Sequence, residues 1–416
     1  MDNQIAALQM GQKFKRTPAG SIPVDWGHRR LGDAAQFVNG HGFAPKDWAA
    51  SGVPIIRIQN LNGGSDYNYY QGSVEDDWVV QPDDLLFSWS GSLGTSFGPF
   101  IWKGPRAVLN QHIFCVKSFE QVDRRYLYQI LRKVTSEIEQ HAHGSAGLVH
   151  ITKKELENFP IPLPPIGEQK VIAEILSTVD VAIEKATGVI NITRVLEREA
   201  TRALLSQDSE AASGEWDAVA LRDVLREPVR NGYSPICPSE PTGLWTLGLG
   251  ALSEDGLRPS RKKPAPVDDP KAAGFRLERG DLLVSRSNTR ELVGLASIYE
   301  GTPENCIYPD LMIRLRVIPE KIDAHFLQRY LVSPNGRRYF QTQARGTSGS
   351  MVKINSAILG DMPVPMPPIG EQRRIVERMN EFRRFVDSAG EAKATLVRLR
   401  QSLMNELLTG RKRVAQ

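Results

Sequence analysis

The chain has 416 residues, which is enough for two or three domains of ordinary size. Hydrophobic residues make up 41% and charged residues 24%, so the composition favours buried cores over disorder. The polar segment 1–20 and the lack of about 18 consecutive apolar residues predict neither a secretory signal nor a membrane span, and hence a cytoplasmic protein. The net charge of +4 permits nucleic-acid binding without demanding it. Disulfides and a zinc site are not expected from the widely separated Cys115, Cys237 and Cys306.

Two long regions of unlike sequence show the pattern of globular α+β domains. In the first region, strands are predicted at 53–58, 84–88 and 113–116, and a helix at 124–140. In the second region, strands are predicted at 244–249, 282–284 and 312–317, and a helix at 324–342. We therefore predict one domain over 1–159, which includes an N-terminal arm, and another domain over 210–362.

A proline-rich block occurs twice, at an offset of 203 residues. It reads PIPLPPIGEQ from Pro160 to Gln169 and PVPMPPIGEQ from Pro363 to Gln372, so eight of ten positions are identical. Proline disfavours the helical conformation in the residue before it, whereas the Gly-Glu-Gln at the end of each block places an acid in the first turn of a predicted helix. The match is too close for chance, so the chain contains a duplicated domain with its connector. The connectors occupy 160–209 and 363–416.

Each block begins a predicted helix of about 40 residues, or about 60 Å, with apolar residues at alternating steps of four and three. We expect the two helices to form an antiparallel coiled coil that holds the two domains apart; in the alternative, each helix packs on its own domain. Glu197, Lys393 and Arg400 fall at seam positions, so either the pairing splays at one end or these charges meet partner subunits. The predicted seam residues are Ile172, Leu176, Val179, Ile183, Ile190 and Leu204 in the first helix, and Ile375, Met379, Phe382, Leu396, Leu399, Leu403 and Leu407 in the second.

The sequence offers little for catalysis. It contains no phosphate-binding loop of the GxxxxGK[ST] type and no Asn/Asp-Pro-Pro-aromatic motif of an amino-methyltransferase. The run 37–42 lacks the spacing of a cofactor loop, and His141 with His143 lacks a third metal ligand. Glu391 and Lys393 resemble the end of a nuclease motif but have no Pro-Asp partner upstream. We therefore expect no catalytic and no metal-binding residues in this chain.

Polar side chains that suit nucleic-acid bases lie beside several predicted strands. In the major groove Arg pairs with guanine and Asn or Gln with adenine, whereas basic residues in loops suit phosphate contacts. The alternative for each single residue is an ordinary surface loop. The candidates in the first region are Arg57, Gln59, Asn60, Ser88, Trp89, Ser90, Asn110 and Gln111. Those in the second region are Lys262, Arg286, Ser287, Asn288 and Arg290, of which Arg286–Asn288 take the places of Trp89 and Ser90.

These features together resemble the specificity subunits of bacterial type I restriction–modification systems. The doubled proline-rich block with its long helix is the most specific element, and the likeness covers essentially the whole chain. The opening run Phe14–Trp26 resembles the start of that family. Further family-like elements are the Asp-Leu-Leu runs at Asp84 and Asp281 and the glycine-containing stretches Gly144–Gly147 and Gly346–Gly349.

The resemblance implies a subunit that is not itself an enzyme. Each of two target recognition domains would read one half of a bipartite, asymmetric site in double-stranded DNA, with the helices setting the spacer. Two modification subunits would dock on the helices and methylate adenine N6 with S-adenosylmethionine, and restriction subunits that use ATP and Mg would join them. This chain itself would bind no cofactor and no membrane.

Three other interpretations stay open at this point. The first is the specificity chain of a type IIB enzyme or of a methyltransferase without a restriction partner. The second, from a different class, is a structural coiled-coil interaction protein with no role on DNA. The third is a stand-alone methyltransferase whose motifs are not recognisable.

Overall fold

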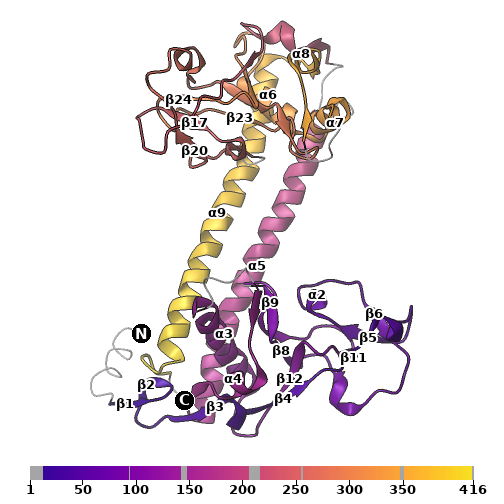
Figure 1. Ribbon diagram of the computed structural model, residues 1–416, viewed down its shortest axis with the longest axis vertical. Coiled ribbons are helices and arrows are strands. Elements are labelled where there is room, and N and C mark those ends of the chain that lie inside the picture. The colour runs from indigo at the N-terminus through magenta and orange to yellow at the C-terminus, as the bar shows by residue number, and fades with distance from the viewer. Residues whose placement is uncertain are drawn as a thin grey trace. The chain divides into compact units, whose positions relative to one another are not determined.

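The computed structural model describes residues 13–92, 94–141, 148–205, 216–253, 256–346 and 351–414. It forms two compact units, one of residues 1–187 with 391–416 and the other of residues 188–390 (Figure 1). Each unit contains part of both long helices, α5 (Ile166–Leu205) and α9 (Ile369–Leu407). The first unit therefore takes its last residues from the far end of the chain.

The first unit is built on a four-stranded antiparallel sheet of order β10-β8-β12-β4. Its strands are β4 (Ala35–Asn39), β8 (Leu85–Ser88), β10 (Gly98–Ile101) and β12 (Ile113–Ser118), and α3 (Arg124–His141) packs against β10 and β12. The four residues of β8 are all buried, as expected for a central strand whose two faces are covered. Phe37, Phe87 and Phe114 fill the core on the side of α3 together with Tyr126 and Leu127.

A second sheet in this unit, of order β6-β5-β11-β7, is mixed. Its strands are β5 (Val53–Ile56), β6 (Asn68–Tyr70), β7 (Val79–Val80) and β11 (Ala107–Leu109), and β11 runs parallel to β5. Shorter elements complete the unit: β1 (Phe14–Thr17), β2 (Gly20–Pro23), β3 (Gly27–Arg30), α2 (Ile58–Leu61), β9 (Ser90–Ser92), β13 (Leu148–His150), α4 (Lys153–Glu157) and β14 (Pro160–Leu163). The proline-rich block thus forms β14, which pairs antiparallel with β3.

The second unit repeats this plan. Its antiparallel sheet has the order β16-β25-β21-β23, and a second sheet has the order β20-β17-β24, with β24 parallel to β17. The strands are β15 (Ala218–Ala220), β16 (Arg230–Asn231), β17 (Trp245–Leu247), β18 (Leu252–Ser253), β19 (Gly256–Leu257), β20 (Lys262–Pro264), β21 (Leu282–Ser285), β22 (Ser287–Asn288), β23 (Ala296–Ile298), β24 (Cys306–Ile307), β25 (Met312–Leu315), β26 (Val352–Lys353) and β27 (Pro363–Pro365). The α+β fold class predicted for both regions is confirmed.

The single helix predicted over 324–342 is wrong, because two helices occupy this stretch. They are α6 (Ala324–Val332) and α7 (Pro334–Gln343), and α8 (Ser356–Gly360) follows further along the chain. Ser333 lies between α6 and α7 in an extended conformation, with φ −65° and ψ 163°. A residue before proline is disfavoured in the helical region, and its hydroxyl here caps α7 by accepting from the backbone N–H of Gly336.

The glutamine that ends each proline-rich block has the same structural role in both units. Gln169 accepts a hydrogen bond from the backbone N–H of Asp123 at 2.9 Å and donates to the carbonyl oxygens of Gln121 at 3.2 Å and Pro164 at 2.8 Å. The buried side chain therefore joins the start of α5 to the residues just before α3. Gln372 makes the same three bonds in the second unit, to Asp323 at 2.8 Å, Lys321 at 3.2 Å and Pro367 at 2.8 Å.

Within the first unit α5 and α9 run antiparallel. Arg400 Nε donates to Asp180 at 2.7 Å, and Arg413, just beyond α9, donates through Nε to Glu168 at 2.7 Å. Arg413 follows Arg400 in the chain, whereas its partner Glu168 precedes Asp180, so the two helices run in opposite directions. The antiparallel pairing is confirmed, and the alternative in which α9 packs only on its own preceding domain is wrong. The apolar residues of both helices in this core are Ile172, Ala173, Leu176, Met404, Leu407 and Leu408.

Several predicted seam residues lie in the cores: Ile172, Leu176, Leu403 and Leu407 in the first unit, and Leu204, Ile375 and Met379 in the second. In α9 the predicted seam residue Leu399 is wrong, because its side chain is 47% exposed whereas Arg400 is 8% exposed. A step of four from Leu396 reaches position 400, so the charged residue holds the seam position. In the second unit Leu205 of α5 shares a core with Ile375 and Met379 of α9.

Arg400 was expected either to splay the helices or to meet a partner subunit, but it bonds to residues of its own chain. Its Nη2 donates to Gln129 of α3 at 3.2 Å, in addition to its bond with Asp180. Asp180 also accepts from Arg132 at 2.8 Å. Burial raises the pKa of Asp180, but the charges of Arg132 and Arg400 outweigh it and hold the pKa below its usual value. Arg400 is therefore satisfied inside the chain. In the second unit Glu197 lies within electrostatic reach of Arg329.

We expect Arg400→Ala to destabilise the protein, because it leaves Asp180 partly buried with one cation fewer. The loss should be about 1–3 kcal/mol in the free energy of unfolding, measured by urea titration, whereas Arg398→Ala on the exposed face of α9 should change it by less than about 0.5 kcal/mol. Because the pKa of Asp180 is lowered in the fold, its contribution is present above about pH 4 and is lost as the pH falls through the folded-state pKa. Equal losses in the two variants at pH 7 would contradict this assignment.

Candidate nucleic-acid interface

In the first unit, polar and aromatic side chains gather where β8 ends. The backbone N–H of Trp89 donates to His112 at 3.3 Å, and its indole Nε1 donates to the carbonyl oxygen of Gln111 at 3.1 Å. Gln111 and His112 belong to the turn between β11 and β12. The Trp89 ring lies 5.1 Å from the ring of His112 and 4.9 Å from that of His150 in β13. Trp89 and His112 are half-buried, and Gln111 and His150 are exposed, so this group presents aromatic and amide surface to solvent.

A glycine holds this turn in place. A Cβ on Gly40 would lie 2.3 Å from the carbonyl oxygens of both Leu109 and Asn110, so only glycine lets the chain after β4 pass so close to the turn. Gly40 N–H also donates to Ile113 at 3.2 Å. The run 37–42 therefore has a structural reason for its glycine, and no cofactor need be invoked.

The second unit builds the same arrangement with other side chains. Arg286 N–H donates to Leu311 at 2.8 Å, and its guanidinium Nη1 donates to the carbonyl oxygen of Asp310 at 3.2 Å. The backbone of Arg286 accepts from Ile354 at 2.9 Å, as that of Trp89 accepts from Ile151 at 3.0 Å. The prediction that Arg286 stands in the place of Trp89 is therefore confirmed. Asp310 and Lys353 take the places of Gln111 and His150, and both are exposed.

Arg57 lies at the same edge of the first unit. Parallel β5 and β11 end side by side, and Asn110 N–H donates to the carbonyl oxygen of Ile56 at 3.0 Å. Arg57 Nη1 donates to Asn68 at 2.8 Å, and its guanidinium lies 5.0 Å from the centre of the Trp48 ring. Contact with an aromatic face orients the guanidinium and leaves donors free for an anionic or base partner.

The predicted residues differ in how far a ligand could reach them. Of those that are buried, Asn60 and Ser88 make hydrogen bonds within their own turns. Exposed side chains belong to Gln59, Gln111 and Arg290, and half-buried ones to Arg57, Trp89, Ser90, Asn110, Lys262, Arg286 and Asn288. Buried side chains belong to Asn60, Ser88 and Ser287. Ser88 donates to the carbonyl oxygen of Ser90 at 2.9 Å, which shapes the bend at Trp89.

Two basic residues of the second unit are already engaged within the chain. Lys262 places its ammonium group 3.9 Å from the centre of the Trp245 ring, and Arg290 Nη1 donates to the carbonyl oxygen of Gln341 at 2.6 Å. Arg261 and Lys263, which flank Lys262, are exposed. Arg261 and Lys263 are therefore better placed for phosphate contacts than Lys262.

Sequence reasoning missed four residues of these groups, which are Trp48, His150, Asp310 and Lys353. The repeat offset of 203 matches His150 to Lys353 and could have found this pair. Trp48 and Asp310 lie in stretches where the two halves share no sequence pattern. The antiparallel pairing of β21 with β25 brings Asp310 to Arg286, and a contact between side chains brings Trp48 to Arg57.

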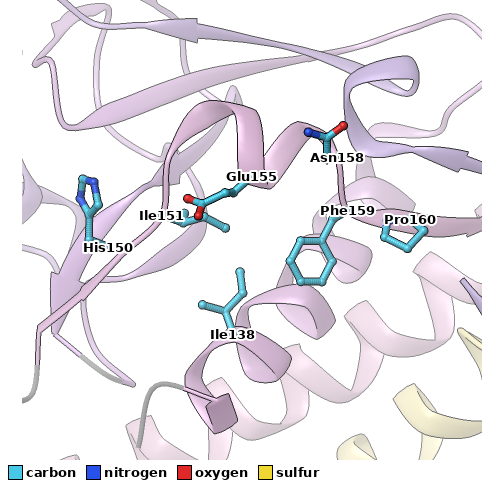
Figure 2. A pocket seen from close by; sticks show the side chains of 7 residues that line it. All are labelled: Ile138, His150, Ile151, Glu155, Asn158, Phe159 and Pro160. Carbon is cyan, nitrogen blue, oxygen red and sulfur yellow. The ribbon is translucent and has the colours of Figure 1, made fainter. Parts of the chain in front are cut away.

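A hollow of about 540 Å³ lies beside His150 (Figure 2). Ile138 and Phe159 give it an apolar side, and Glu155 and Asn158 lie at its rim. The Glu155 carboxylate accepts from the hydroxyl of Thr152 at 2.6 Å, and these hydrogen bonds lower the pKa of Glu155. The carboxylate thus belongs to the capping box of α4 and not to a catalytic pair.

Other chemistry finds little support among the described residues. Within them, no group of three or more His, Cys, Asp and Glu side chains is placed to hold a metal, and no helix is long and apolar enough to cross a membrane. The three cysteines are unpaired, and burial raises the pKa of Cys115 to about 11 and that of Cys306 to about 12, so both are protonated thiols at neutral pH. His143 lies outside the described residues, as does the stretch Gly144–Gly147.

Comparison with known proteins supports the family resemblance. Residues 23–193 match the family described as type I restriction modification DNA specificity domain. The chain is 26% identical to the type I restriction enzyme MjaVIII specificity subunit of Methanocaldococcus jannaschii over 97% of this chain and 96% of that one. It is 23% identical to the EcoKI specificity subunit of Escherichia coli, over 94% and 90%. The predicted resemblance to specificity subunits is confirmed.

Solved structures show the same fold. The S subunit of a type I restriction–modification system from M. genitalium has a TM-score of 0.54 at 17% identity, covering 92% of this chain and 96% of that one. A chain solved in work on complex assembly and conformational transition of the type I system has a TM-score of 0.59 at 18% identity, covering 94% and 99%. The predicted fold of two α+β domains with two long antiparallel helices is confirmed.

We expect Asn60→Ala to destabilise the first domain rather than to alter only its ligand contacts. Asn60 is 4% exposed, accepts from Arg57 N–H at 2.9 Å and donates to the carbonyl oxygens of Gly64 at 3.1 Å and Asp66 at 3.0 Å. Leaving these groups unpaired should lower the free energy of unfolding by about 1–3 kcal/mol. The neighbouring exposed Gln59→Ala serves as the control and should leave thermal unfolding unchanged. A destabilised Gln59 variant beside a stable Asn60 variant would contradict this.

Proposed function

We propose that this chain is the DNA-reading subunit of a type I restriction–modification complex and recognises a bipartite, asymmetric site in double-stranded DNA. The observation that carries the proposal is the pair of equivalent turns at Trp89 and Arg286. The same backbone bonds hold both turns, but their exposed side chains differ in charge and hydrogen-bonding capacity. Two copies of one reader with unlike side chains suit two unlike half-sites.

The side chains at these turns suit base edges better than catalysis. Gln111 and Asp310 are exposed amide and carboxylate groups, and Arg57 and Arg286 are guanidinium groups held by neighbours. Arg, Gln and Asp are the residue types that pair with guanine, adenine and cytosine in the major groove. No described pair among them has a nucleophile beside a base.

The partners follow from the resemblance and belong to the proposal. Two modification subunits would dock on this chain and methylate adenine N6 with S-adenosylmethionine, and restriction subunits would supply ATP- and Mg-dependent cleavage. The chain itself would bind none of these cofactors and would act in the cytoplasm. A type IIB enzyme or a methyltransferase without restriction would use an equivalent chain, so the neighbouring subunits decide between these systems.

The direct test is co-expression of the chain with its modification subunits in a host without methylation, followed by methylome sequencing. We expect N6-methyladenine at one sequence composed of two short halves and a fixed spacer. A modification subunit expressed alone should give none. Methylation that does not depend on the chain would overturn the proposal and favour the structural coiled-coil interpretation. Binding of S-adenosylmethionine by the purified chain alone would favour a stand-alone methyltransferase.

Replacing residues 17–159 with the matching domain of another specificity subunit should change one half-site only. The reason is that each proposed reading turn lies within a single compact unit. Methylome sequencing of cells with the chimaera would show the new half-site, and the reciprocal replacement of 216–362 is the matched control. Altered bases in both halves would rule out one domain per half-site.

Adding one helical turn to both α5 and α9 should change the spacer and not the half-sites. Four residues inserted after Thr193 and four after Asp387 lengthen each helix by about 6 Å, or about one to two base pairs of DNA. Methylome sequencing would report the spacer length. An unchanged spacer, or a changed base within either half, would show that the helices do not measure the distance between the half-sites.

A further inference from the structure

The turns that carry Gln111 and Asp310 each bind the side chain at the end of the neighbouring central strand. The two units differ in both residues of this pair. In each turn a side chain at the end of the central strand donates to the carbonyl oxygen of the middle turn residue. Trp89 does so to Gln111 at 3.1 Å, and Arg286 does so to Asp310 at 3.2 Å. The side chain of the middle residue stays exposed in both turns. Each turn therefore presents a fixed pair of neighbouring groups to a ligand.

In the second unit this pair consists of a donor and an acceptor of opposite charge. Arg286 donates to the Asp310 carbonyl oxygen through Nη1, and its buried Nε has no hydrogen-bond partner among the described residues. Asp310 accepts from the hydroxyl of Ser234 through Oδ1, and its N–H donates to the same hydroxyl at 3.2 Å. The carboxylate is therefore held through Oδ1, and among the described residues Oδ2 has no hydrogen-bond partner.

From this geometry, and resting on the proposed function, we infer that Arg286 and Asp310 together read a G·C base pair in the second half-site. Guanine shows two acceptors in the major groove, N7 and O6, and the paired cytosine shows the N4 amino donor. The two terminal nitrogens of the Arg286 guanidinium supply donors for the two guanine acceptors, and the Asp310 carboxylate supplies an acceptor for cytosine N4. The same pair suits an A·T pair poorly, because adenine N6 would then face a donor.

The matching position of the first half-site then holds an A·T pair. The indole N–H of Trp89 is already bonded to the chain, so Trp89 offers a ring face and no free donor. The Gln111 amide carries both a donor and an acceptor, as the edge of adenine requires, and the apolar ring suits the thymine methyl group. The two domains thus read different base pairs at structurally equivalent positions.

The test uses the complex of the full chain with its modification subunits, and it compares methylomes of single variants. Arg286→Lys keeps the charge but loses the fork of donors, and Asp310→Ala removes the acceptor. Each should relax one G·C position of one half-site, lowering discrimination there by about 10- to 100-fold. The control is Arg279→Ala, an exposed arginine just before β21, whereas Arg286 follows that strand, and it should leave the motif unchanged.

A second experiment tests whether substitutions in the first unit create the G·C preference. Trp89→Arg combined with Gln111→Asp should convert the A·T preference at the matching position of the first half-site to G·C. Thermal unfolding of each variant shows whether it is folded. If the wild-type complex methylates a bipartite site but folded Arg286 and Asp310 variants keep every base of it, the inference fails alone. If the wild-type complex methylates no bipartite site, the proposed function itself fails.

Discussion

The first domain depends on an ion pair that joins it to the end of the chain. Glu168, whose side chain is 1% exposed, accepts two hydrogen bonds from Arg413, at 2.7 and 2.9 Å, and one from the indole of Trp26 at 2.9 Å. Arg413 also binds Asp25 of the N-terminal arm at 2.8 Å. A buried carboxylate without such partners would be costly, so the arm, the start of α5 and the end of α9 are coupled energetically. The domain is complete only when the last helix has folded onto it.

The duplicated sequence preserves the contacts that fix each long helix to its sheet domain. Both copies use the same glutamine bonds to join the long helix to its sheet domain, through Gln169 and Gln372. The scaffold is therefore constant, and the variation lies in the turns beyond the central strands. A constant frame with variable turns is how one fold can present different binding chemistry.

The sequence was sufficient for the features that repeat. The doubled proline-rich block, the two α+β domains and most of the helix seam follow from periodicity and self-similarity, which are local signals. Leu399 was assigned to the seam because it is apolar, whereas the strict spacing selects Arg400, whose charge is satisfied by Asp180 and Gln129 far away in the sequence. Asn60 was assigned to DNA contacts although it is buried, and Asp310 was missed, because tertiary contacts set the burial of the one and the neighbours of the other.

The bond from Trp89 or Arg286 to a main-chain oxygen has an evolutionary consequence. A carbonyl acceptor is present whatever side chain its residue carries, so any residue with a suitably placed N–H donor can occupy this strand end without disturbing the turn. The middle turn residue, whose side chain takes no part in that bond, is equally free to vary. New binding preferences can therefore arise by one or two substitutions, with no insertion or backbone change, while both halves of the molecule keep a common frame.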